Sequence, residues 1–260
     1  MNLPTSTACW ALIERPGNRV YRFPDEAAML TNVFVALTQA IVEIQERQQR
    51  VQLAVGGGRT MRELFETMAR LGGASRIDSA GLELWWVSER YVASSDPDRN
   101  STQALGQLAK TFAIVPAQIH AMPMTSTTAD AQKAAQQYGA EIGERVFDLC
   151  VVGMGAAGEV GAIYPDHPSL TTAVESSAKT FGVSDPPSGK GERISLTFET
   201  INSSREVWIL ASGQHKAVSL QRALSGDPAL PAAHLMGKER TRWFVDEAAA
   251  SELTYYQCQL

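Results

Sequence analysis

The chain has 260 residues, a mass of 28.2 kDa and a formal net charge of −5 at neutral pH. This length allows one large α/β domain over residues 1–260, and the 44% hydrophobic and 20% charged residues are ordinary for a soluble globular protein. A pI near 5.5 argues against broad nucleic-acid binding, which requires clustered positive charge.

Two further features indicate where the protein works. The first residues lack the basic flank and apolar core of a signal peptide, and we find no run of membrane-spanning length, so no membrane partner is expected. The three cysteines, Cys9, Cys150 and Cys258, are odd in number and widely spaced, which predicts neither a disulfide framework nor a metal site. These patterns favour the cytoplasm, and a monomer or weak homo-oligomer is expected.

Strands and helices are expected to alternate through the first half of the chain. A strand at Val20–Phe23 precedes a helix that begins at Pro24–Glu26, where negative charge favours the first turn, and continues to about residue 45. Apolar residues at helical or strand spacing predict the elements that follow. These are the strand Val51–Val55, the helix Thr60–Leu71, the strand Leu82–Val87, a polar loop over Ser88–Asn100 and a helix through Ala104 and Leu108.

The second half of the chain continues the alternation. Its expected elements are a helix over Ala129–Glu144, strands at Phe147–Val152, Ile194–Phe198 and Val207–Ala211, a helix over Gln214–Leu224 and a strand at Arg242–Val245. Such repetition predicts an α/β fold, Rossmann-like, with a mostly parallel sheet and helices on both faces. Ligands of these folds bind beyond the carboxyl ends of the strands, so the loops after residues 55, 87 and 152 should converge on one crevice.

A glycine run, Gly56-Gly57-Gly58, lies between an expected strand and an expected helix that begins at Thr60. Glycines let backbone N–H groups approach an anion, and the helix N-terminus favours negative charge. A tight turn that needs positive φ is the simpler interpretation. Three consecutive glycines exceed that need, so we favour a phosphate site; the run lacks the P-loop lysine and the dinucleotide-binding spacing.

Two cations follow other strands of the expected sheet. Arg90 could hold a phosphate through its planar fork of donors, although a solvated arginine beside Glu89 is the simpler interpretation. Lys216 begins the helix after Val207–Ala211 and could place its ammonium near the same edge, although most such lysines are solvated. Each is weak evidence when taken alone.

The turn after Phe147–Val152 is dense in glycine, including Gly155 and Gly158, and delivers a carboxylate, Glu159. The four histidines, His120, His167, His215 and His234, show no metal-ligand spacing. No serine lies in a G-x-S-x-G nucleophile elbow. A reaction without metal or organic cofactor, or simple binding, is therefore expected.

Taken together, these loops resemble the 6-phosphogluconolactonases, whose fold group also contains the glucosamine-6-phosphate deaminases. The resemblance covers most of the chain and depends on ordered motifs. The family's W-x-D-E-R-x-V block is similar to Trp86–Val92, with its trailing asparagine at Asn100, and its F-D-L-x-L-L-G-M-G-x-D-G-H-x-x-S-L-F-P signature is similar to Phe147–Pro165. Further matches are Leu53–Gly58, Pro186-Pro187 with Arg193–Thr197, Gly213–Lys216, Pro231–Ala233 and Trp243–Ala249.

This resemblance implies a glucosamine-6-phosphate deaminase-like fold and hydrolysis of 6-phosphoglucono-δ-lactone to 6-phosphogluconate in the oxidative pentose phosphate pathway. It implies no metal and no cofactor. The glycine loop, Arg90 and Lys216 would hold the phosphate, with Thr60, Gly155 and Arg193 as further candidates for binding the substrate. The histidine of the family's G-H pair would be the general base toward water.

The chain departs from the family pattern at three positions. Glu159 replaces the base histidine, Ser88 replaces the aspartate of D-E-R, and Asp185 falls where the family has a lysine before its proline pair. A glutamate is a weaker base than imidazole, and its charge would repel an anionic substrate. His167 is a conceivable substitute base.

Three functions therefore remain open: a lactonase that uses Glu159 as its base, which we favour, a non-catalytic sugar-phosphate-binding relative, and an amino-sugar-phosphate deaminase or isomerase. The last is disfavoured because Ala162–Pro165 lacks the Asn and Glu of the deaminases' F-N-E-P-type segment.

Overall fold

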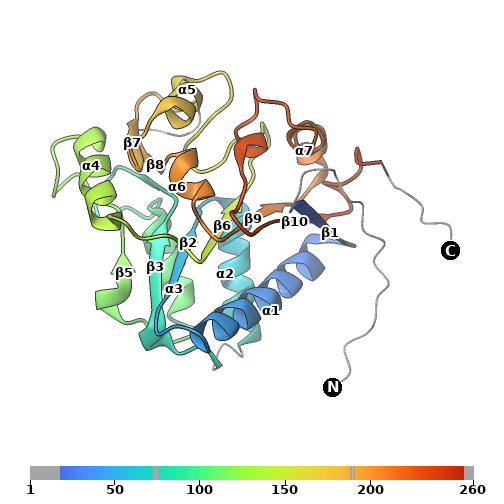
Figure 1. Ribbon diagram of the computed structural model, residues 1–260, viewed down its shortest axis with the longest axis horizontal. Helices are drawn as coiled ribbons and strands as arrows, with labels where there is room; N and C mark the ends of the chain where they lie inside the picture. Colours follow the sequence, from blue (N-terminus) through green and yellow to red (C-terminus); the bar gives the residue numbers. More distant parts are fainter. Residues whose placement is uncertain (1–17, 73–75, 188, 190, 255–260) are drawn as a thin grey trace.

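The computed structural model describes residues 18–72, 76–187, 189 and 191–254. Within them, seven parallel strands form the central sheet in the order β1-β10-β9-β6-β2-β3-β5 (Figure 1). The strands are β1 (Asn18–Phe23), β2 (Val51–Val55), β3 (Leu82–Trp86), β5 (Ile119–His120), β6 (Leu149–Gly153), β9 (Glu206–Ala211) and β10 (Arg240–Asp246). The expectation of a Rossmann-like, mostly parallel sheet is confirmed.

A smaller antiparallel sheet, β4-β8-β7, stands beside the central one. Its strands are β4 (Ser88–Arg90), β7 (Thr180–Val183) and β8 (Arg193–Leu196). The helices are α1 (Glu26–Gln45), α2 (Arg59–Leu71), α3 (Asn100–Leu108), α4 (Ala131–Ile142), α5 (Pro168–Glu175), α6 (Phe198–Asn202) and α7 (Ala217–Leu224), with a 3₁₀ turn at Gln214–Lys216 before α7. In Figure 1, α1, α2 and α3 lie on one side of the central sheet, and α5, α6 and the small sheet lie on the other.

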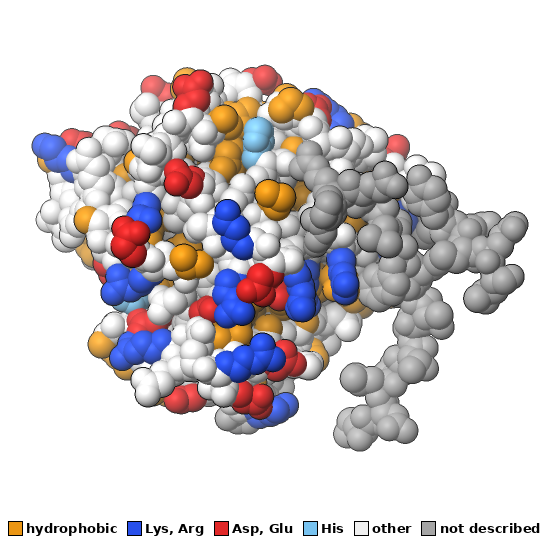
Figure 2. Space-filling view, viewed as in Figure 1, with side chains coloured by type: hydrophobic (Ala, Val, Ile, Leu, Met, Phe, Trp, Pro, Cys, Tyr) orange, Lys and Arg blue, Asp and Glu red, His pale blue; other side chains and the backbone are white. Residues whose placement is uncertain are grey.

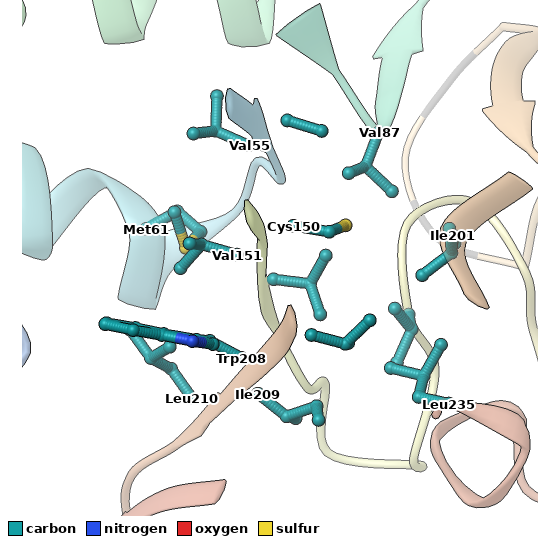
Figure 3. Packing of buried hydrophobic residues seen from close by; sticks show 14 of the residues in the cluster. Val55, Met61, Val87, Cys150, Val151, Ile201, Trp208, Ile209, Leu210 and Leu235 are labelled. Atoms are coloured by element: carbon teal, nitrogen blue, oxygen red, sulfur yellow. The ribbon is translucent and has the colours of Figure 1, made fainter. Parts of the chain in front are cut away.

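Both faces of the central sheet are covered, as expected from its apolar strands. Alternate side chains of β9 point to opposite faces: Trp208 and Leu210 lie on the side of Met61 from α2, whereas Ile209 lies on the side of Ile201 from α6 (Figure 3). All these side chains are fully buried. A parallel strand that is buried on both faces needs an almost continuous apolar sequence, which is why these strands were recognisable.

The structure corrects two sequence-based expectations and adds elements to them. The expected polar loop at Ser88–Asn100 begins with a strand, β4, because Ser88–Arg90 pairs with the buried strand β8. The expected strand Ile194–Phe198 ends at Leu196, and Thr197 caps the short helix α6 through its side chain. The elements β5, α5 and β7 were not foreseen, since they are short and lack a clear period.

Helix α1 is, by length and composition, apolar enough to cross a membrane, contrary to the sequence-based expectation that no run was long enough. One face of the helix carries Met29, Leu30, Val33, Phe34, Leu37 and Ile41, all buried. Asp25 caps its N-terminus by accepting a hydrogen bond from Ala28 N–H at 2.8 Å. The helix packs against α2 and β10, so this apolar face belongs to the core.

Cys150 is fully buried in β6, where burial raises the pKa of its thiol to about 12, so this thiol is inert. Cys9 and Cys258 lie outside the described residues.

On the face seen in Figure 2, basic and acidic side chains are interspersed.

The end of β10 is tied to the end of β9 by a buried carboxylate, Asp246. It accepts hydrogen bonds from Ser212 Oγ at 2.6 Å, from Gly213 N–H at 3.0 Å and from Ala249 N–H at 2.7 Å. Only 4% of Asp246 is exposed, so these donors replace its water. The contacts fix the turn that begins at Gly213 and leads into α7.

We expect Asp246→Ala to lower the free energy of unfolding by about 3 kcal/mol, because three buried donors lose a charged acceptor. Urea unfolding measures the change. The control is Asp227→Ala, which removes a carboxylate that pairs with Arg222 on the surface and should cost much less. Equal losses in the two variants would contradict the structural role of Asp246.

Candidate active site

A cavity of about 500 Å³ opens at the carboxyl edge of the central sheet. Its walls come from the loops after β2, β6 and β9, together with β4, the start of α3 and the segment before β8. The predicted convergence of the loops after residues 55, 87 and 152 is confirmed. The predicted site residues all line this cavity: Gly56, Gly57, Gly58, Thr60, Arg90, Gly155, Glu159, Arg193 and Lys216.

The glycine run places a bare helix N-terminus at the cavity. Gly58 has φ of +89°, a conformation that glycine adopts without strain, and α2 starts directly after it with no side-chain cap. A Cβ on Gly57 would lie 2.2 Å from the side-chain carbonyl carbon of Asn100, so only glycine fits against that residue. The first N–H groups of α2 thus face the cavity without a side-chain acceptor, as an anion site requires.

Arg90 is held at the wall of the cavity by neutral oxygen atoms. Its Nη1 donates to the carbonyl oxygen of Asp98 at 2.6 Å and to Asn100 Oδ1 at 3.0 Å. Asn100 in turn donates from Nδ2 to the carbonyl oxygen of Ser88 at 2.8 Å. The simpler interpretation was a solvated arginine beside Glu89, whereas the guanidinium of Arg90 is held by Asp98 and Asn100. Its positive charge remains available to a ligand.

Glu89 is a structural carboxylate that sequence reasoning missed. It is fully buried and accepts from Arg90 N–H at 2.9 Å, from Asn100 N–H at 2.6 Å and from Ser101 N–H at 2.8 Å. Arg99 Nε lies 3.8 Å from it. The carboxylate thus caps α3 and fixes both Arg90 and Asn100, and its negative charge also suits a helix N-terminus.

Lys216 is an almost buried cation, 5% exposed, and its Nζ donates to Thr60 Oγ1 at 3.3 Å. Burial is the main reason that the pKa of its ammonium is lower than usual, and the nearby Arg59 adds to the effect. Arg59 itself forms an ion pair with Glu26, at 2.9 Å between Nη2 and Oε1. Lys216 has no such partner among the described contacts, so an anion in the cavity would relieve the cost of its burial.

Arg193 reaches the cavity from the start of β8. Its Nη1 donates to the carbonyl oxygens of Gly191 at 2.9 Å and Glu192 at 3.1 Å. Burial is the main reason that the pKa of this guanidinium is lower than usual, and Arg90 contributes by repulsion. Two guanidinium groups that repel each other in one cavity favour an anionic ligand between them.

Glu159 lies in the turn after β6, and its side chain folds over Gly155. A Cβ on Gly155 would lie 1.9 Å from the carboxyl carbon of Glu159, so glycine is required there. Glu159 Oε2 accepts from Ala157 N–H at 2.9 Å, and Gly155 N–H donates to the carbonyl oxygen of Glu159 at 2.9 Å. The turn therefore presents a half-buried carboxylate to the cavity with one oxygen atom fixed.

The other positions that differ from the family pattern lie in different places. Ser88 lines the cavity, where a serine now stands beside the two arginines. Asp185 lies outside it, has φ of +47° and contributes its carbonyl oxygen to His167 Nε2 at 3.2 Å. His167 also lies outside the cavity, because it caps the N-terminus of α5 through its hydrogen bond with Ser169. The structure thus gives His167 no place as a substitute base.

Two further cavity residues, His215 and Tyr164, received no role from sequence reasoning. Their only signal was proximity to the motifs, His215 within Gly213–Lys216 and Tyr164 beside Pro165. Among the described residues, no group of three His, Cys, Asp or Glu side chains could hold a metal ion.

Because Lys216 is buried with a single hydroxyl partner among the described contacts, Lys216→Met should raise the free energy of unfolding by on the order of 1 kcal/mol at pH 7. A lysine whose pKa is lowered by folding destabilises the protein below that pKa, and the cost disappears as pH rises toward 10.5. The gain in Lys216→Met should therefore shrink between neutral pH and pH 10.5 in urea unfolding.

The control for this prediction is Lys133→Met, which removes an exposed lysine of α4. It should leave the free energy of unfolding almost unchanged at every pH. A loss of stability in Lys216→Met would mean that the ammonium is already satisfied by the protein.

Comparisons with known proteins agree with this geometry. A family model described as "Glucosamine-6-phosphate isomerases/6-phosphogluconolactonase" matches residues 24–243. The 6-phosphogluconolactonase of Streptomyces coelicolor is 33% identical over 243 residues, which is 88% of this chain and 92% of that protein. The Mycobacterium tuberculosis 6-phosphogluconolactonase is 32% identical over 244 residues, covering 89% of this chain and 96% of its own length.

Solved structures extend the similarity to the fold. The crystal structure of 6-phosphogluconolactonase from Thermotoga maritima aligns with a TM-score of 0.76 at 27% identity, covering 88% of this chain and 99% of the other. A monomeric glucosamine-6-phosphate deaminase aligns with a TM-score of 0.73 at 18% identity, covering 90% of this chain and 99% of the other, which shows the shared fold alone. The chain belongs to the glucosamine-6-phosphate isomerase/6-phosphogluconolactonase family.

Proposed function

We propose that this protein hydrolyses 6-phosphoglucono-δ-lactone to 6-phosphogluconate, the second step of the oxidative pentose phosphate pathway. The observation that carries the proposal is a cavity that joins the phosphate-type loop and the cations Arg90, Arg193 and Lys216 to the carboxylate of the signature turn. Relatives at 32–33% identity over most of their length are named 6-phosphogluconolactonase, which supports the same reaction. We further propose that the chain acts as a single domain in the cytoplasm, as a monomer or weak homo-oligomer.

The phosphate of the substrate would bind at the N-terminus of α2. The backbone N–H groups after Gly58 and the ammonium of Lys216 lie together there, since Lys216 contacts Thr60 in the first turn of that helix. Arg90 and Arg193 supply further positive charge. An anion in this position would neutralise charges that are otherwise buried at a cost.

Glu159 would accept a proton from the attacking water. Its Oε2 is fixed by Ala157 N–H, and among the described contacts its Oε1 accepts no hydrogen bond. As the water oxygen bonds to the lactone carbonyl carbon, one water proton would pass to Oε1. An ordinary carboxylate is a weaker base than imidazole, so we expect turnover to be slower than with a histidine at this position.

A second candidate function is binding of a sugar phosphate without turnover. Two observations favour it: a negative charge at Glu159 lies close enough to Lys216 to interact with it, and Ser88 offers no carboxylate to the cavity. The phosphate-binding groups would remain intact in such a protein. Deamination or isomerisation of an amino-sugar phosphate is less favoured, because Ile163 and Tyr164 occupy the segment where those enzymes have Asn and Glu.

The first test supplies purified protein with freshly generated 6-phosphogluconolactone and follows acid release above the spontaneous rate. Wild type should show enzymatic hydrolysis, and Glu159→Gln should lose about 10²-fold in kcat, since a general base contributes roughly 10²–10⁴-fold. His167→Ala is the control and should retain full activity, because His167 lies outside the cavity. No excess over spontaneous hydrolysis would leave the binding function instead.

The second test measures binding of 6-phosphogluconate by the rise in melting temperature and by calorimetry. Arg90→Ala should weaken binding by about 10- to 100-fold, as expected for the loss of a charged hydrogen bond of about 1.5–3 kcal/mol. Arg145→Ala removes an exposed arginine of the turn after α4 and should bind as wild type does. Unaltered affinity in Arg90→Ala would place the phosphate elsewhere.

A further inference from the structure

His215 differs from the other histidines of this protein in its hydrogen bonding. His120 pairs with Glu83 and Glu141, His167 contacts Ser169 and the carbonyl oxygen of Asp185, and His234 contacts the carbonyl oxygen of Pro228. Within the described part of the chain, neither ring nitrogen of His215 has a hydrogen-bond partner. Its imidazole is therefore free to exchange a proton with a ligand.

The position of His215 brings this imidazole to the same cavity as Glu159. It lies on the 3₁₀ turn after β9, and Glu159 lies on the turn after β6, the neighbouring strand of the sheet. The ring folds over Gly213, where a Cβ would lie 2.7 Å from His215 Cε1. Since Asp246 fixes the N–H of Gly213, the turn that carries His215 is well anchored.

The charged groups that share the cavity with Glu159 and His215 are less suited to proton transfer. Both oxygens of Glu89 accept backbone N–H hydrogen bonds, so its carboxylate is used within the protein. Lys216 and the arginines supply positive charge to an anion. Glu159 and His215 both line the cavity. Each has an atom without a described hydrogen bond, Oε1 of Glu159 and the ring nitrogens of His215, which can accept or donate a proton.

Lactone hydrolysis needs two proton transfers, one from the attacking water and one to the leaving ring oxygen, and two groups in the same cavity can divide them. We propose that His215 is a second proton-transfer residue, which protonates the ring oxygen of the lactone while Glu159 takes the proton of the attacking water. This inference rests on the proposed function and deepens it. An imidazole can donate a proton when charged and accept one when neutral, which is why histidine is the commonest general acid or base in enzymes.

The step balances in atoms and charge. The water oxygen bonds to the carbonyl carbon, the bond from that carbon to the ring oxygen breaks, and its electron pair stays on the ring oxygen. The imidazolium of His215 gives that oxygen its proton, and Glu159 holds the proton of the water. Because His215 is exposed at the mouth of the cavity, solvent can restore its proton after each turnover.

The test compares wild type with His215→Gln in kcat and KM between pH 5 and 8, after subtraction of spontaneous hydrolysis. Wild-type kcat should fall as pH rises across this range, because only a protonated imidazole can donate a proton to the ring oxygen. His215→Gln should lose about 10²-fold in kcat at pH 6, keep its KM, and show no such fall. In His215→Ala, added imidazole should restore part of the kcat.

Gln214→Ala is the matched control, since Gln214 is the exposed neighbour that does not line the cavity, and it should behave as wild type. If wild type is active and His215→Gln keeps the same kcat and pH profile, the proposal for His215 is overturned and the proposed function stands. A raised KM with unchanged kcat would also overturn it, because His215 would then be a phosphate contact beside Lys216. A wild type without any turnover would instead remove the proposed function on which this proposal rests.

Discussion

The parallel direction of the seven central strands is the constraint on which the site depends. Because all of them end at one edge, the loops after β2, β6 and β9 must meet there, although more than 150 residues separate the first from the last. The buried faces of these strands leave the loops little freedom. The cavity is therefore a consequence of topology before any of its side chains is considered.

Three buried charges, Glu89, Asp246 and Lys216, differ in how the protein compensates them. Glu89 and Asp246 are surrounded by backbone N–H groups and a hydroxyl, so each is compensated within the protein and serves to fix a loop. Lys216 has a single hydroxyl partner and a pKa lowered chiefly by burial. A charge that folding leaves uncompensated identifies the place where a ligand supplies the missing countercharge.

In the proposed chemistry, different residues of the cavity bind the phosphate and transfer protons. The groups suited to a phosphate are intact, whereas the position of the family's base histidine carries Glu159, and Ser88 stands where the family has an aspartate. An imidazole lines the same cavity, on the turn after β9 rather than after β6. In a parallel sheet, a proton-transfer residue can be placed on the turn after either of two neighbouring strands, because both turns line the same cavity.

The sequence by itself determined six of the seven central strands and the main helices, because apolar runs and glycine-rich junctions are local signals. The nine predicted cavity residues came from those junctions together with the ordered motifs that resemble the family. Short elements such as β4, β5 and β7 escaped it, since two to four residues carry no period and form a strand only when a partner strand is present. Only the tertiary structure decided that the guanidinium of Arg90 contacts Asn100, that His167 caps a helix, and that His215 lines the cavity. Those outcomes depend on contacts between residues that are distant in sequence or on the direction of a side chain, and a local pattern contains neither.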